Sequence, residues 1–341
     1  MSTAPTIPLF GRVWSLQVLT APVEGQDQQT LLNVSTSTGS DDDKALRIVF
    51  DVEMSVGHAL WEAHISIYNL APSNIGLITQ GAEVSLAIGY QANGNPTEIW
   101  RGLVFQPTFE RQDVVDFVLT LHCLLGLPEI VNNFTNCAVG PVSTQWTIVQ
   151  QAAKSAGINV AHLDDPSAFT GQQLPRGRTV FGTPNRLFGQ IAQQNNMVSF
   201  YSPQGLVMGK PGASSGTPDL TYAPPLAAGQ QPASDEASID RRLIGSPQQT
   251  ELGASFRVLG DARLQIRLPL MQVKLDQAVI RQQALPLGKF ASILNQDGVY
   301  LVAGVRHIGD SRGNQWYSEV VGIASVQGLL ALLGSGNSSF N

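Results

Sequence analysis

Short stretches in which apolar and polar residues alternate dominate the first third of the chain. The run from Leu46 to Met54 shows the cleanest alternation, with an apolar side chain at every second position. A period of two is typical of a β-strand with one buried face. Several such strands predict an antiparallel barrel or sandwich, with Phe50, Ile67 and Leu86 in its core. The predicted strands are 11–19, 46–55, 63–70, 83–90, 98–105 and 114–122.

Turn residues mark the connections between these strands. Pro72 fits the first position of a short helix, and Gly81 fits a left-handed residue that ends it. Asn93-Gly94-Asn95-Pro96 predicts the turn of a hairpin. The polar segment 35–44 contains three adjacent aspartates and predicts a solvated loop, because calcium loops space their carboxylates at alternate positions and end on a glutamate.

The hydrophobic period becomes helical after residue 124. Trp146 and Val149 recur at helical spacing in a predicted helix that Gly157 ends. A second predicted helix begins at Thr183, and a hairpin follows it. These elements predict a small α/β domain over residues 125–210.

Strand-like alternation resumes after a segment rich in Gly, Ser, Pro and Ala at 211–240, which predicts a long loop. Gly102 precedes Val118 by 16 residues, and Gly304 precedes Val320 by the same distance. Two related β-domains would leave such a repeat, although the chance alignment of two hairpins explains it equally well. The predicted late strands are 254–259, 263–268, 271–275, 290–294, 299–307 and 316–324.

Composition indicates a surface poor in charge. Only 13% of the 341 residues are charged, against about 25% in typical soluble domains. Such a surface is either neutral and hydrated or covered by neighbouring subunits, and we favour partial coverage. Residues 1–170 carry a net charge of −10 and residues 171–341 carry +4. Basic residues do not cluster, and only Arg241 and Arg242 are adjacent, so specific nucleic-acid binding is not expected.

No motif in the sequence predicts a catalytic or cofactor site. The histidines at 58, 64, 122, 162 and 307 lack metal-ligand spacing. The segment 212–216 matches the G-x-S-x-G motif, but it has the composition of a loop instead of a strand-to-helix turn. Whether Cys123 and Cys137 pair stays open. We therefore expect no enzymatic activity, no cofactor and no metal, and we find neither a secretory signal nor a run of ~18 apolar residues.

The order of elements from residue 60 to residue 104 carries a family resemblance. The strand Ile65-Ser66-Ile67-Tyr68-Asn69-Leu70, a Pro-led turn of helix, Gly89-Tyr90 and Trp100-Arg101-Gly102 follow one another. This order resembles the N-terminal barrel of baseplate hub proteins from contractile-tailed bacteriophages, the late control D-like family. The match covers residues 46–122 well and the remainder only by element order.

The resemblance implies a mainly β fold with a small α/β part, in which two antiparallel β-barrel, tube-like domains flank an inserted α/β domain. The implied boundaries are 1–124 for the first barrel, 125–210 for the inserted domain, 211–240 for a loop, 241–333 for the second barrel and 334–341 for a flexible tail.

The resemblance further implies a structural hub in the virion tail baseplate, made in the host cytoplasm. Three chains would form a ring with a central channel that adapts the hexameric tail tube to a trimeric spike. The implied partners are other copies of the chain, the tail tube or tube-initiator protein, the central spike and other baseplate proteins. The genome would pass through the channel without being specifically bound.

Two other classes of function stay open. A tail-associated enzyme such as a peptidoglycan hydrolase would need a carboxylate pair or a metal cluster, and the sequence contains neither in a suitable context. A carbohydrate-binding β protein would use exposed tryptophans, but the positions of the tryptophans favour core packing. These are Trp14, Trp61, Trp100, Trp146 and Trp316.

The C-terminal segment is the candidate interface with other proteins. Its apolar residues cover nearly the whole circumference of a short helix, and one barrel surface is too small to bury them all. A helix wedged between two domains of its own chain is the alternative. The predicted interface residues are Val326, Leu329, Leu330, Leu332 and Leu333, together with Arg241 and Arg242.

Overall fold

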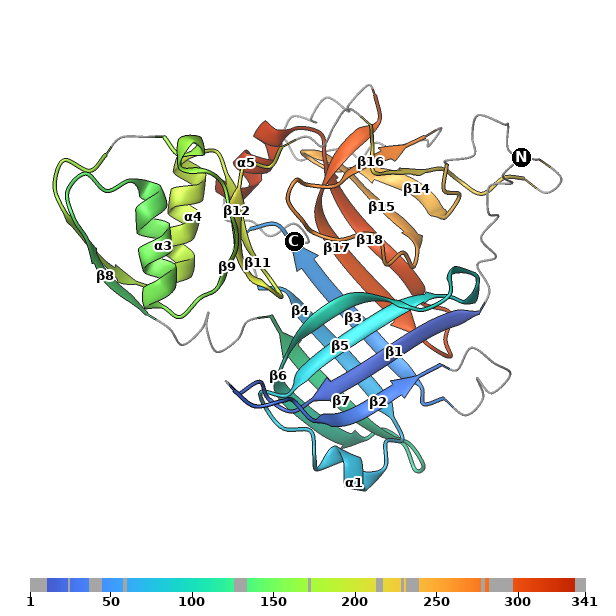
Figure 1. The fold of residues 1–341 in the computed structure, drawn as a ribbon. Helices are drawn as coiled ribbons and strands as arrows, with labels where there is room; N and C mark the ends of the chain where they lie inside the picture. Colours follow the sequence, from blue (N-terminus) through green and yellow to red (C-terminus); the bar gives the residue numbers. More distant parts are fainter. Residues whose placement is uncertain are drawn as a thin grey trace.

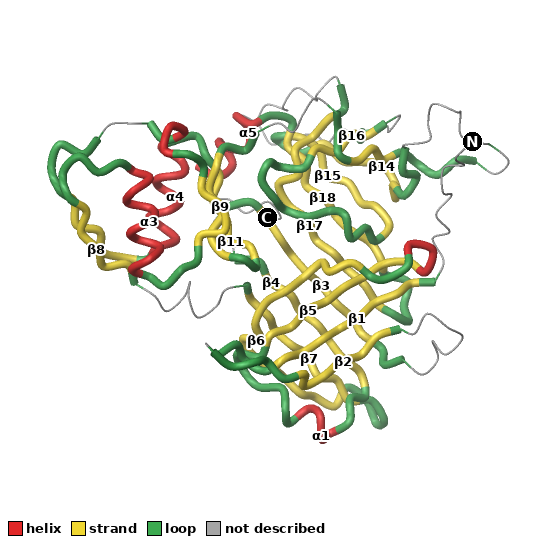
Figure 2. Tube along the Cα trace, viewed as in Figure 1, coloured by secondary structure: helices red, strands yellow, loops and turns green. Residues whose placement is uncertain are grey.

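The computed structural model describes residues 11–23, 25–36, 45–57, 60–125, 134–170, 173–212, 217–227, 230, 239–276, 280–281 and 297–334. Strands dominate the fold, and the helices are few and short (Figure 1, Figure 2). The strands are β1 (Arg12–Leu19), β2 (Thr30–Ser35), β3 (Ile48–Ser55), β4 (Glu62–Tyr68), β5 (Glu83–Tyr90), β6 (Thr97–Arg111), β7 (Phe117–Leu124), β8 (Thr135–Val139), β9 (Val160–Leu163), β10 (Arg178–Gly182), β11 (Val198–Ser202), β12 (Gly205–Gly209), β13 (Leu220–Tyr222), β14 (Leu243–Gln249), β15 (Gly253–Leu259), β16 (Gln272–Leu275), β17 (Val299–Asp310) and β18 (Trp316–Ile323). The helices are α1 (Pro72–Ile75), α3 (Gln145–Ser155), α4 (Pro184–Gln194) and α5 (Val326–Gly334), with 3-10 turns at η2 (Gln91–Asn93) and η3 (Pro166–Ala168).

The first seven strands form the first β region, in the antiparallel order β2-β1-β5-β6-β7-β4-β3. Strand β3 buries alternate side chains from Ile48 to Met54, as its sequence predicts. Phe50, Ile67 and Leu86 are at most 1% exposed, so the predicted core residues are confirmed. The alternation predicts these strands well because every second residue meets the same core.

Strand β17 joins this region to the second β region, made of β13 to β18. It pairs with β18 along one edge, while its other edge pairs first with β16 and then with β3. A register shift between Val302 and Gly304 marks the change of partner. The result is one sheet of 13 strands, whose path ends at β2 and β14. The mainly β, antiparallel fold class is confirmed, but the described strands form an open sheet instead of two closed barrels.

The α/β region lies between the two β regions in sequence. Helices α3 and α4 lie between the β8–β10 pair and the sheet β11-β12-β9 (Figure 1). Thr144 caps α3 by accepting a hydrogen bond from the Thr147 amide at 3.3 Å, and Gly157 follows with φ +68°. Pro184 occupies the first turn of α4. Both predicted helices are confirmed, since caps and periodicity are local signals.

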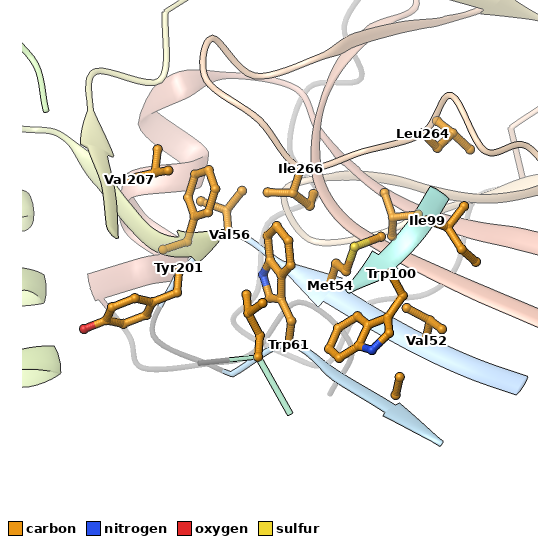
Figure 3. Packing of buried hydrophobic residues seen from close by; sticks show 14 of the residues in the cluster. Val52, Met54, Val56, Trp61, Ile99, Trp100, Tyr201, Val207, Leu264 and Ile266 are labelled. Atoms are coloured by element: carbon orange, nitrogen blue, oxygen red, sulfur yellow. The ribbon is translucent and has the colours of Figure 1, made fainter. Parts of the chain in front are cut away.

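One apolar core joins all three regions. The ring of Trp61 stacks on Phe200 of β11, with centroids 5.8 Å apart, and its Nε1 donates to the Ser55 carbonyl at 2.8 Å. Figure 3 shows Trp61 below Ile266 of the second β region, in the same cluster as Val207 of β12. The three regions therefore share buried surface.

Residues 263–268, predicted as a strand, form none. Leu264 and Ile266 are buried while Arg263 and Arg267 are exposed, so the alternation is real. The segment has no pairing partner in the described sheets. A turn in which Asp261 accepts the Arg263 amide lies at its start. Alternation alone cannot distinguish a paired strand from an extended loop on a core.

Other differences arise where pairing depends on distant residues. The predicted loop at 211–240 contains β13, which pairs in parallel with β16. Strands β2, β8, β9, β10 and β14 carry weak alternation, and the prediction missed them. The predicted strand 290–294 and nearly all of the loop 35–44 and the tail 334–341 lie outside the described residues.

Two smaller predictions also need correction. Helix α1 ends at Ile75 with Gly76 as its cap, so Gly81, with φ +87°, belongs to the next turn. In the proposed repeat, Gly304 pairs with Val321 on the strand that follows it, whereas Gly102 pairs with Val84 on the strand before it, and Val118 pairs with Glu110. The equal spacing therefore does not mark equivalent positions. No helix in the described part of the chain is long and apolar enough to cross a membrane.

Candidate functional site

Two ion pairs close the seam between β3 and β17. Arg306 donates to both carboxylate oxygens of Asp51, at 2.8 and 2.6 Å. Arg47 donates to both oxygens of Asp310, at 3.1 and 2.6 Å. Two parallel bonds fix the orientation of a guanidinium as well as its distance. The seam therefore has a defined register in the middle of the β3–β17 ladder and at its Asp310 end.

An aromatic contact fills the buried side of the same seam. The rings of Phe50 and Trp316 meet edge to face, with centroids 5.4 Å apart. Gly309 lies opposite Phe50 in the ladder, and a Cβ built there would come within 2.2 Å of the ring. Arg12 covers Trp316 at 5.5 Å and donates to the carbonyls of Asp310 and Gly313. The two β regions are thus joined by side-chain packing as well as by strand pairing.

A row of charged side chains crosses the seam on the solvent-facing side of the sheet. We call Arg257, Glu319, Arg306, Asp51, Glu53 and Glu62 the charged row; they lie on β15, β18, β17, β3 and β4. Arg257 donates to Glu319 at 2.5 Å. Burial raises the pKa of the Glu53 carboxyl. The charge of Glu62 raises this pKa further, and the charge of Arg306 lowers it. Basic and acidic side chains alternate in the part of the row on β15, β18 and β17. The part on β3 and β4 is acidic.

Two histidines continue the face beyond the acidic end. His64 and His122 lie opposite each other on β4 and β7, with ring centroids 4.9 Å apart. Burial and the charge of His64 lower the pKa of His122. His122 is therefore neutral at neutral pH. Within the described ranges, no three His, Cys, Asp or Glu side chains gather into a group that would hold a metal ion.

Ser318, His307 and Asp261 have the composition of a catalytic triad but not its geometry. The Ser318 hydroxyl lies 2.8 Å from His307 Nδ1 and accepts the Asp261 amide at 3.1 Å. Ser318 and His307 are both 0% exposed, so no substrate reaches them. The Asp261 carboxylate bonds to Tyr222 and Arg263. This cluster holds the core together.

The other residues considered for chemistry form no site in the described chain. His162 is exposed and its Nε2 lies 3.0 Å from Asp164 Oδ1. Cys123 and Cys137 are free thiols, and burial raises the pKa of Cys123 to about 12. Four of the five tryptophans are buried and Trp146 is half-buried, so core packing is confirmed. His58 and residues 213–216 of the G-x-S-x-G segment lie outside the described residues.

Helix α5, the predicted interface, packs within its own chain. Leu329 is fully buried, and Val326, Leu330 and Leu333 are half-buried. Leu330 and Leu333 line a small cavity together with residues of α4 and the loop after it. The side chain of Leu332 is outside the described set. A contact with another subunit through the partly exposed residues stays a prediction.

Arg241 and Arg242, also predicted at an interface, lie beside a buried charge network. Arg242 is 4% exposed and forms ion pairs with Asp240 at 3.0 Å and Asp261 at 3.6 Å. Burial opposes ionisation of Asp261, but the bonds from Arg263 and the charge of Arg242 lower its pKa overall. Arg241 donates to the Pro224 carbonyl. Arg242 is therefore held within its own chain by two carboxylates. A contact of Arg241 and Arg242 with another subunit stays a prediction.

Two exposed apolar patches on the surface are not predicted from the sequence. One is the tip of the β6–β7 hairpin, where Val114 and Val115 are 76% and 77% exposed. The other is the pair formed by Phe134, just before β8, and Phe181 on β10. The first patch has a signal in the sequence, namely two valines between Asp113 and Asp116. These valines are instead assigned to the start of a predicted strand.

Comparison with known proteins adds a fold relationship. The structure resembles the 43 kDa tail protein of prophage MuSo2 from Shewanella oneidensis, with TM-score 0.53 and 10% identity over 94% of this chain and 98% of that one. It also resembles a tail protein from Neisseria meningitidis MC58, with TM-score 0.54 and 11% identity over 92% and 97%. A chain of the Francisella PdpA-VgrG complex gives TM-score 0.50 and 7% identity over 92% and 58%. No protein-family model and no curated protein matches the sequence. The chain therefore shares its fold with phage tail proteins.

Proposed function

We propose that this protein is a structural baseplate hub of a phage tail. The observation that carries the proposal is the fold likeness to two tail proteins, which extends over 92–94% of this chain and 97–98% of theirs. At this level of identity the likeness concerns the fold, so the role in the tail is our inference. In this proposal the protein lies in the virion baseplate after synthesis in the host cytoplasm.

We further propose that three chains form a ring with a central channel. The boundaries 1–124 and 241–333 then describe two tube-like domains per chain, and three chains present six similar units to a hexameric tail tube. The opposite side presents three units to a trimeric spike. The β3–β17 seam supports this arrangement, because paired strands hold the two units of one chain at a constant spacing.

In this proposal the solvent-facing side of the sheet lines the channel. The charged row contains four carboxylates and two guanidiniums, and both guanidiniums are paired with carboxylates. A wall of this kind offers DNA phosphates no free cations, and phosphate neutralisation dominates non-specific binding. The genome then passes without being held.

The test is the mass of the protein in solution and in tails. Light scattering of the purified chain, alone and mixed with the tail tube or tube-initiator protein, the spike and other baseplate proteins, is expected to give a three-chain species. Electron microscopy of tails is expected to place three copies between tube and spike. A stable monomer in both settings contradicts the proposal.

We also propose that the protein has no enzymatic activity. The support is the burial of Ser318 and His307, the one serine–histidine pair with short contact in the described chain. Purified protein is expected neither to clear cell-wall preparations nor to hydrolyse esters. Clearing that disappears on Ser214→Ala would contradict this and favour the tail-associated hydrolase.

A further inference from the structure

The β6–β7 hairpin presents an apolar tip in a defined conformation. Val114 and Val115 form the tip, and the rings of Phe109 and Phe117 stack below it with centroids 5.7 Å apart. Arg111 crosses the tip, donating to the carbonyls of Asp113 and Val114 and lying over Phe117. These bonds hold the valines outward, so their exposure does not result from a loose loop.

The hairpin is also anchored at its base and acidic around its tip. Asn69 donates to Asp116 at 2.9 Å and accepts the Phe117 amide at 3.0 Å. Glu110 and Asp113 form no ion pair with any described residue, although Asp113 Oδ1 accepts the Val114 amide at 2.6 Å. Arg111 is occupied by backbone carbonyls. The tip therefore combines two exposed valines with carboxylates available to a partner.

A pocket of about 510 Å³ at the other end of the molecule is also apolar but carries the opposite charge. Phe134 and Phe181 form one wall, 60% and 76% exposed and stacked with centroids 6.2 Å apart. Arg178 and Arg186 line the same pocket, and neither forms an ion pair within the described residues. This pocket combines an apolar wall with two available cations.

We propose that the hairpin tip of one copy docks into the Phe134–Phe181 pocket of a second copy. The valines and carboxylates of the tip match the phenylalanines and arginines of the pocket. Because the chain carries both surfaces, the occupant of the pocket is a second copy of the same chain. Figure 1 places β8, beside the pocket, and α1, beside the hairpin, at separate ends of the molecule, so the contact joins different copies. Such a head-to-tail contact makes a ring when its rotation closes. The inference rests on the proposed self-assembly and names its contact surfaces.

The test uses two surface variants of the full chain, each with a matched control. The hairpin variant carries Val114→Asp and Val115→Asp, and its control is Leu77→Asp, another exposed apolar residue. The pocket variant carries Arg178→Glu and Arg186→Glu, and its control is Lys154→Glu on the exposed side of α3. Sedimentation velocity measures association, and thermal unfolding checks that every variant keeps the wild-type fold.

Each variant alone is expected to weaken association by about 100-fold, with both controls unchanged. An equal mixture of the two variants is the decisive sample, because one retains an intact pocket and the other an intact hairpin. It is expected to form a two-chain species that grows no further.

Three results would overturn the inference: wild type that does not associate, variants that associate like wild type, or a mixture that remains monomeric. Folded variants that stay trimeric would overturn these contact surfaces and leave the hub proposal standing. The hub proposal fails separately, if assembled tails do not contain three copies.

Discussion

At the scale of single residues, Gly309 shows how tightly the two β regions meet. It lies opposite Phe50, whose ring occupies the space that any larger side chain would need. Phe50 is itself buried and held against Trp316, so it has little room to move. The seam depends on the smallest residue at this point of β17.

Gly309→Ala is expected to lower the free energy of unfolding by about 1–3 kcal/mol, because the added methyl overpacks the seam. Chemical denaturation measures the change. Gly76→Ala is the control, since no atom lies within 4 Å of a Cβ built there. Equal effects of the two substitutions would contradict this account of the seam.

His307 gives a second prediction at this scale. Burial lowers its pKa to about 4 in the folded protein, against about 6.5 in an unfolded chain. Between these values the unfolded state binds more protons, so acidification favours unfolding. We expect His307 to contribute about 2 kcal/mol to the loss of stability between pH 7 and pH 5.

Denaturation of wild type and His307→Gln across this pH range measures the contribution. The variant keeps a polar side chain near Ser318 but does not titrate, and every other group is common to both proteins. The difference in stability between them is therefore expected to shrink as the pH falls. A difference that is independent of pH would contradict the prediction.

At the scale of elements, α5 connects regions that are distant in sequence. It follows β18 directly, and its residues meet α4 of the α/β region. Leu330 and Leu333 line the cavity that α5 shares with α4. Leu329 is fully buried, whereas Gln327 on the same helix is exposed. The helix therefore fastens the α/β region to the second β region.

Leu329→Ala is expected to lower the free energy of unfolding by about 2–5 kcal/mol, the usual cost of a buried leucine. Hydrogen exchange is expected to rise in α4 as well as in α5. Gln327→Ala is the control and is expected to change neither quantity. Wild-type stability in Leu329→Ala would contradict the described packing.

At the scale of the whole molecule, the two β regions are one sheet. In the β3–β17 ladder, the edge strand of each β region pairs with the edge strand of the other. Trp61 packs against the α/β region and lies in the core that all three regions share. An unpaired apolar strand edge readily pairs with other chains. Neither β region is therefore complete without the other.

Residues 1–124 produced alone are expected to aggregate or to remain partly unfolded. The fragment exposes the β3 edge and removes Trp316 from Phe50. Size-exclusion chromatography and circular dichroism of the fragment, beside the full chain in the same buffer, make the measurement. A monodisperse fragment with the strand content of the first β region would show that the seam is dispensable.

The sequence by itself determined the elements whose signals are local. Alternation identified β3 and β5 because each buried face repeats every second residue, and Thr144, Gly157 and Pro184 identified the ends of two helices through their own backbones. It also determined the fold class and the core positions of Phe50, Ile67 and Leu86. These features require no knowledge of which strands are neighbours.

Only the tertiary structure decided the features that depend on distant partners. Arg306 and Asp51 are 255 residues apart, and nothing near either residue indicates their pairing. Burial of Arg242 depends on Asp261, and the extended segment at 263–268 is no strand because no neighbour pairs with it. The physical reason is common to all three: a strand edge, a buried charge and an interface are completed by atoms that the local sequence does not contain.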